Sequence, residues 1–159
     1  MADRPQGRRN VRQEGSRKEE AAQAGGGEFS DANYAALAEF RYALRKFLAF
    51  SESAARNVGL TSQQHQALLA LRGFAKDGAL TVGDLAERLL VRHHSAVELV
   101  DRLEKLDLVQ RSADPADGRR ALVRLTETGE ARLRELSSIH VEELRSIGPA
   151  LAAMLAPLA

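Results

Sequence analysis

The side chains of this chain that could do chemistry are basic and polar groups suited to contacts with a nucleic acid. One group precedes an amphipathic segment, and the other follows a run of turn residues. A guanidinium can form two parallel hydrogen bonds with guanine, and it gains from the enhanced negative potential of a narrow minor groove. The first group is Arg92, His93, His94 and Ser95, and the second is Arg119 and Arg120.

The segment behind the first group predicts a helix with one buried face. That face must pack on a core, which leaves the opposite face and the start of the helix free to touch a partner. At the start, the free backbone N–H groups and the helix dipole favour a phosphate, although Ser95 could equally be only a helix cap. The apolar residues recur at the three- and four-residue steps of an amphipathic helix, and they are Ala96, Leu99, Val100, Leu103 and Leu106.

A hairpin is expected directly after this helix. Residues 108–112 and 121–125 are short strand-like runs, and residues 114–118 between them supply Pro for a fixed φ and Gly for a positive φ. Ahead of the helix, Thr81 and Asp84 fit a capping box that opens a supporting helix. Two helices with an Arg-bearing hairpin beside them suit duplex DNA, because a helix fits the major groove and a narrow loop fits the minor groove.

The order of four segments in this region resembles the winged helix-turn-helix of the MarR family of bacterial transcription regulators. The segments are DLAERL, LVDRLE, DPADGRR and RLTETG, and the likeness covers about residues 31 to 145. It implies a mainly α fold with a small β-hairpin wing, in which the winged helix-turn-helix is flanked by N- and C-terminal dimerisation helices. It also implies that a wing arginine enters the minor groove. Arg119 is the expected residue, with Asp117 to steady it and Arg120 for a phosphate.

The chain divides into a basic arm and one domain. Residues 1–28 show no hydrophobic periodicity and end in three glycines, which is typical of a disordered arm. Residues 29–159 are expected to form a single MarR-like domain. Within it, the dimerisation helices are expected at 31–57 and 129–158, around a winged helix-turn-helix at 61–128.

Helix boundaries are indicated by caps and breaks. Gly148-Pro149 is expected to break the last long helix and to leave a short apolar helix behind it. The first helix has a broader apolar surface than one packing partner requires, which favours contact with a second subunit. The side chains suited to cap a helix start are Ser30 or Asp31, Thr61 with Gln64 in a capping box, and Thr126.

Composition narrows the class of protein. The chain has 159 residues, a formal net charge of +1 and no cysteine, so any basic footprint is local, and disulfides and thiolate metal sites are excluded. No apolar run reaches the length of a membrane span, and the N-terminus has no apolar stretch of the secretory type, which favours a cytoplasmic protein. The motifs of hydrolases, phosphate loops and zinc peptidases are absent, so we expect neither an enzyme nor a cofactor.

Four further residues can be assigned from their type and place. Arg88 and Arg111 are expected to contact phosphates. His65 and His140 are expected to be packed or half-buried, because no ligand spacing around them predicts a metal site. A metal at the adjacent His93 and His94 is not expected either, since neighbouring side chains on a helix point about 100° apart.

Two positions depart from the family pattern. Glu98 lies where many relatives carry a polar or basic residue that faces DNA, and its carboxylate could accept from cytosine or repel phosphate. Asp107 stands where a glycine usually ends the recognition helix, and aspartate tolerates the left-handed conformation better than most residues.

These observations predict a homodimeric, sequence-specific regulator, a repressor, that binds double-stranded DNA at a pseudo-palindromic operator with half-sites about 10 base pairs apart. The resemblance implies release by a small aromatic ligand between the dimerisation helices and the winged domain, where Tyr34, Arg41 and Phe47 are the expected neighbours. The alternative is a winged-helix protein–protein interaction module without specific DNA binding, which the near-neutral charge and Glu98 favour.

Overall fold

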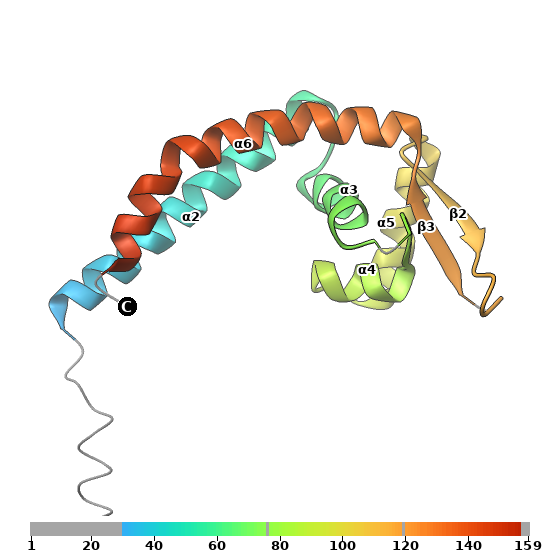
Figure 1. Cartoon of the computed structure of the whole chain (residues 1–159), viewed down its shortest axis with the longest axis horizontal. Coiled ribbons are helices and arrows are strands. Elements are labelled where there is room, and N and C mark those ends of the chain that lie inside the picture. The colour runs from blue at the N-terminus through green and yellow to red at the C-terminus, as the bar shows by residue number, and fades with distance from the viewer. Residues whose placement is uncertain (1–29, 76, 119, 157–159) are drawn as a thin grey trace, which may run out of the picture.

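The molecule consists of a pair of long helices and a second unit of shorter helices with a small sheet (Figure 1). The computed structural model describes residues 30–75, 77–118 and 120–156, so the expected basic arm at residues 1–28 lies outside the described residues. In chain order the elements are α2 (Asp31–Asn57), α3 (Ser62–Phe74), β1 (Leu80–Thr81), α4 (Val82–Leu89), α5 (His93–Lys105), β2 (Val109–Ala113), β3 (Ala121–Leu125) and α6 (Glu127–Leu155).

The second unit is a winged helix-turn-helix built from α3, α4, α5 and the sheet, as the sequence predicts. Capping boxes start α3 and α4. Thr61 Oγ1 accepts from the Gln64 N–H at 3.2 Å, and Thr81 Oγ1 accepts from the Asp84 N–H at 3.1 Å. The Gln64 and Asp84 side chains accept in return from the N–H groups of the two threonines, so donors that the helix leaves free are satisfied. The predicted starts of both helices are confirmed.

The sheet has one more strand than the predicted hairpin. β2 and β3 pair antiparallel along their length, and the two-residue β1 adds to β3 with Leu80 opposite Val123. A strand of two residues is too short for an alternation of apolar and polar residues to indicate it. β1 connects α4 to the wing, because Thr81 is both the end of this strand and the cap of α4.

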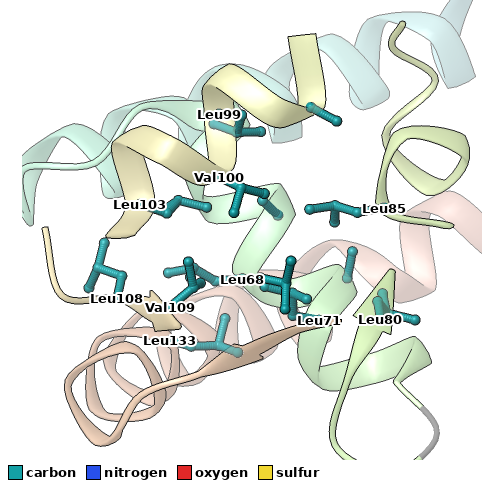
Figure 2. Packing of buried hydrophobic residues seen from close by; sticks show 14 of the residues in the cluster. Leu68, Leu71, Leu80, Leu85, Leu99, Val100, Leu103, Leu108, Val109 and Leu133 are labelled. Atoms are coloured by element: carbon teal, nitrogen blue, oxygen red, sulfur yellow. The ribbon is translucent and has the colours of Figure 1, made fainter. Parts of the chain in front are cut away.

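The core of the second unit gathers around α5. Four predicted members of its apolar stripe, Ala96, Leu99, Val100 and Leu103, are at most 1% exposed. Figure 2 shows that the last three lie among leucines and valines from α3, α4 and the sheet. Leu106, the fifth predicted member, is half exposed because α5 ends at Lys105 and Leu106 is its C-cap.

The two long helices, α2 and α6, lie side by side and extend away from the winged unit (Figure 1). Ser30 caps α2. α6 is continuous to Leu155, so the predicted break at Gly148-Pro149 is wrong. Pro149 removes one N–H donor, but its fixed φ suits a helix, and Leu151 and Met154 beyond it are half-buried. Within the described ranges, no helix is both long enough and apolar enough to span a membrane.

The start of α6 packs tightly against the end of α5. The Thr126 hydroxyl donates to the Asp107 carbonyl at 2.6 Å, and the Thr126 N–H donates to the Leu108 carbonyl at 3.2 Å. Asp107 has the left-handed φ expected of it, 55°. A Cβ added to Gly129 would overlap the Leu108 carbonyl oxygen. Gly129 therefore permits the close approach of the two backbones.

We expect Gly129→Ala to lower the free energy of unfolding by about 1–3 kcal/mol, because the added methyl group forces the backbones of α6 and Leu108 apart. Urea denaturation followed by circular dichroism measures this change. Gly148→Ala is the matched control in the same helix, since an added Cβ there meets nothing within 4 Å. The control should gain up to about 1 kcal/mol from the better helix propensity of alanine. Equal effects of the two substitutions would contradict the packing role of Gly129.

Candidate nucleic-acid interface

α5 begins with a group of exposed basic side chains. Arg92 is its N-cap, with an extended backbone (φ −69°, ψ 151°) and no capping bond from its side chain. His93 and His94 are exposed in the first turn, and Ser95 is half-buried behind them. Ser95 is therefore not the helix cap, and that alternative is wrong. Because the cap residue offers no side-chain acceptor, the first N–H groups of α5 suit an anionic partner.

The loop of the wing is closed by hydrogen bonds between its two ends. The Asp114 N–H donates to the Arg120 carbonyl at 3.1 Å. Arg120 Nε lies 3.5 Å from Asp117 Oδ2, and the exposed fractions of these side chains are 64% and 44%. An exposed pair of this kind contributes little to stability, so Arg120 can exchange it for a phosphate. Asp117 thus contacts Arg120, whereas Arg119, the residue expected in the minor groove, lies outside the described residues.

A hollow of about 600 Å³ joins the start of α4, one side of α5 and the wing. His93 stands on one wall and Arg120 on another. Asp84 and Asp101 also line the hollow, but Asp84 already accepts from the cap of α4 and Asp101 pairs with Arg111. A polar concavity between a recognition helix and a wing suits the sugar–phosphate backbone that runs between two grooves.

Arg111 lies at the base of the wing and makes its contacts within the chain. Its Nη1 lies 2.6 Å from Asp101 Oδ1 and 2.5 Å from Glu104 Oε2, and its Nη2 donates to the Val97 carbonyl at 3.2 Å. Two carboxylates therefore neutralise the guanidinium of a side chain that is only 26% exposed. This arrangement gives no support to the expected phosphate contact, and we leave Arg111 out of the proposed DNA contacts.

α4 ends with two residues of unequal interest for the interface. The guanidinium of Arg88 lies 4.5 Å from the centre of the Phe74 ring, a cation–π contact that directs it toward α3. Leu90 is the C-cap in the left-handed conformation (φ 55°, ψ 40°), which a leucine rarely adopts, and it is 93% exposed. The sequence does not predict this turn, because a leucine carries no turn signal.

Known proteins match this chain over most of its fold. A family model described as MarR family matches residues 58–120. The crystal structure of a probable transcriptional regulator from Pseudomonas aeruginosa is 30% identical, with a TM-score of 0.55 over 74% of this chain and 95% of that one. The chain belongs to the MarR family.

Two further relatives agree with this MarR-family assignment. A mutant of S. aureus MepR, bound to an oligodeoxyribonucleotide, is 25% identical, with a TM-score of 0.61 over 76% of this chain and 95% of that one. The HTH-type transcriptional repressor NicR of Pseudomonas putida is 36% identical over 93 residues, 58% of this chain and 57% of NicR. The chain spans about half the length of the curated relatives it matches.

Three α2 residues were expected to neighbour a small ligand in this MarR-family chain. Tyr34 and Arg41 are exposed, and Phe47 is half-buried, with its ring centre 6.0 Å from that of His140. At 1.5 Å per residue, Tyr34 and Phe47 are separated by roughly 20 Å along α2. The structure therefore does not bring the three residues together within one chain.

A buried histidine pair joins the two long helices to α3 in this MarR-family fold. The rings of His65 (α3) and His140 (α6) have centres 4.6 Å apart, and both side chains are buried, as the sequence predicts. His140 Nε2 lies 2.8 Å from Ser51 Oγ, and His140 Nδ1 lies 2.7 Å from the Leu136 carbonyl. Burial, and after it the neighbouring His140, lowers the pKa of His65 to about 4. The described residues contain no group of three or more potential metal ligands.

This pKa predicts a loss of stability in mild acid. The unfolded chain protonates His65 at a pKa of 6.5, whereas the folded chain resists protonation until about pH 4. The contribution of neutral His65 to the free energy of unfolding is therefore complete above pH 6.5. It decreases by up to about 3 kcal/mol as the pH falls toward 4. Urea unfolding at pH 7.5, 6 and 5 measures the slope. His65→Leu should flatten the slope, and the exposed-site control His94→Gln should not. A slope that survives His65→Leu unchanged would show that other groups cause it.

Proposed function

We propose that this chain is a sequence-specific DNA-binding transcription regulator that acts as a homodimeric repressor. α5 places Arg92, His93, His94 and Ser95 in a major groove, and the wing places Arg119 in the flanking minor groove, with Asp117 and Arg120 beside it. The observation that carries this proposal is the hollow whose walls come from α4, α5 and the wing together. It supports one continuous interface across two grooves, because one residue of each basic group, His93 and Arg120, lines it.

Relatives support the same function. The MepR mutant aligned over 95% of its length is bound to an oligodeoxyribonucleotide, and NicR is named a transcriptional repressor. We propose no catalytic activity for the chain, and we place it in the bacterial cytoplasm, where its DNA lies. Arg88 remains a secondary candidate for a phosphate, because its contact with Phe74 is on an exposed surface that a phosphate can also reach.

The proposed homodimer rests on the apolar surface of the long helices. We infer that a second copy of this pair covers it about a two-fold axis, because a monomer rarely exposes so much apolar surface. In this proposal residues 31–57 and 129–158 dimerise, and residues 61–128 bind DNA. The large hydrophobic residues exposed on this pair are Tyr34, Leu37, Tyr42, Leu44 and Leu48 of α2 with Ile139, Val141, Leu144 and Leu155 of α6.

Two-fold symmetry has a consequence for the operator. A symmetric dimer with one α5 per half-site requires a pseudo-palindrome, with half-sites about 10 base pairs apart, or one helical turn. Each half-site includes the major-groove bases under α5 and an outer minor groove under the wing. A·T pairs in that outer segment suit the wing, since their minor groove is narrow.

We also propose that a small aromatic effector releases the DNA. Tyr34, Arg41 and Phe47 are the candidate contacts, and Phe47 is the best placed of the three. It packs beside His140, where α2, α3 and α6 meet. A ligand at this joint acts on the angle between the long helices and the winged unit. That angle sets the spacing of the two recognition helices in a dimer.

Enrichment of a random DNA pool, followed by affinity measurements on the enriched site at several salt concentrations, tests this function. We expect the affinity to decrease as salt rises, because bound phosphates release their counterions. Arg119→Ala should weaken binding by about 1–3 kcal/mol and relax the preference in the outer segment. Arg120→Ala should weaken binding on all sequences alike and reduce the salt slope by about one.

Arg134→Ala, at an exposed position of α6, is the matched control and should change neither quantity. An affinity that Arg119→Ala leaves unchanged would remove Arg119 from the groove.

A winged-helix protein–protein interaction module is the second candidate, because Glu98 puts a carboxylate on the exposed face of α5, where it repels phosphate. Failure to enrich any DNA at low salt would favour that candidate.

A further inference from the structure

We propose that Arg111 is a positioning residue for DNA recognition. It fixes the angle between the wing and α5, so that the wing reaches its minor groove while α5 occupies the major groove. This inference rests on the proposed DNA binding. Arg111 acts through Val97, Asp101 and Glu104 of α5 and does not contact the DNA.

Arg111 contacts α5 over two helical turns. Besides the contacts of its guanidinium with Asp101, Glu104 and the Val97 carbonyl, its backbone N–H donates to Glu104 Oε1 at 3.1 Å. Val97 and Glu104 are seven residues apart, which is roughly 10 Å along the helix axis. Contacts spread over this length resist rotation of the strand relative to the helix, whereas one contact alone would act as a pivot.

The place of Arg111 in the strand makes these contacts decisive for the wing. Arg111 pairs with Val123, and directly opposite residues of an antiparallel pair lie on the same face of the sheet. Val109 and Val123 on this face are buried in the core, while Ala113, the next residue outward, is exposed. The apolar contact of the wing with α5 therefore ends near Arg111, and its ion pairs continue that contact outward.

A small change of angle at Arg111 produces a large displacement in the loop. Asp114 is three residues beyond Arg111, so at about 3.3 Å per residue a rotation of about 10° moves it by roughly 2 Å. Hydrogen bonds weaken steeply outside a range of a few tenths of an ångström, so this displacement removes a loop arginine from the reach of a groove. Charge-assisted bonds in a half-buried setting, where screening by salt is reduced, are suited to prevent it.

The test compares two DNA sites: the enriched site, and a version whose outer A·T pairs are replaced by G·C, which changes the minor groove under the wing. We expect wild-type protein to prefer the enriched site by about tenfold, the effect of a lost groove contact. Arg111→Met should bind both sites within about twofold. It should keep its dependence on the major-groove bases under α5. A residue that only stabilises the fold would weaken both kinds of recognition together.

A variant with both Asp101→Ala and Glu104→Ala removes the two carboxylates that Arg111 contacts and leaves the wing sequence unchanged, and it should lose the same preference. Adding Arg111→Met to this variant should cause no further loss, because all three residues take part in the same set of contacts. Gln110→Ala, exposed on the opposite face of β2, is the control and should behave as wild type.

An Arg111→Met protein that unfolds cooperatively on heating and keeps the tenfold preference would overturn the inference. If Arg111→Met does not fold, the variant with Asp101→Ala and Glu104→Ala decides by the same criterion. Wild-type protein that enriches no DNA would overturn the proposed function and this inference with it, and that failure is visible before any variant is made.

Discussion

The burial of one face of α5 is the constraint on which the rest of the structure depends. Ala96, Leu99, Val100 and Leu103 are almost completely excluded from water, and close packing against α3, α4 and the sheet allows the helix one rotation about its own axis. That rotation turns His94 and Glu98 outward. The position of the start of α5 follows from the left-handed turn at Leu90, so packing and turn together decide which side chains a partner meets.

The wing is held to this helix by a different kind of interaction. Apolar packing ends near Val109 and Val123. Beyond these residues, the ion pairs of Arg111 with two carboxylates of α5 hold the wing to the helix. These carboxylates also neutralise the arginine, so the basic footprint is confined to the start of α5 and the loop of the wing. The formal net charge of the chain is only +1. Its proposed affinity for DNA therefore depends on the accurate placement of a few cations, whereas a strongly basic protein would depend on their number.

Local signals explain what the sequence could predict. The side chains of Ser30, Thr61 and Thr81 cap helices by accepting from the backbone N–H three residues later. The stripe of α5 follows from helical periodicity. The features it could not predict depend on distant parts of the chain. Asp101 and Glu104 alternate with basic residues as on a solvated helix face, and only the register of β2 brings Arg111 to them. Similarly, α6 continues through Pro149 and lies beside α2, which is far from it in the sequence (Figure 1).

Methylation protection on the enriched DNA site tests the central claim most directly, because dimethyl sulfate modifies guanine N7 in the major groove and adenine N3 in the minor groove. The proposed interface predicts protection of guanine N7 in two half-sites about 10 base pairs apart, with protection of adenine N3 just outside each of them. Protection in one groove only, or at a single half-site, would contradict a symmetric dimer that reads two grooves with α5 and the wing.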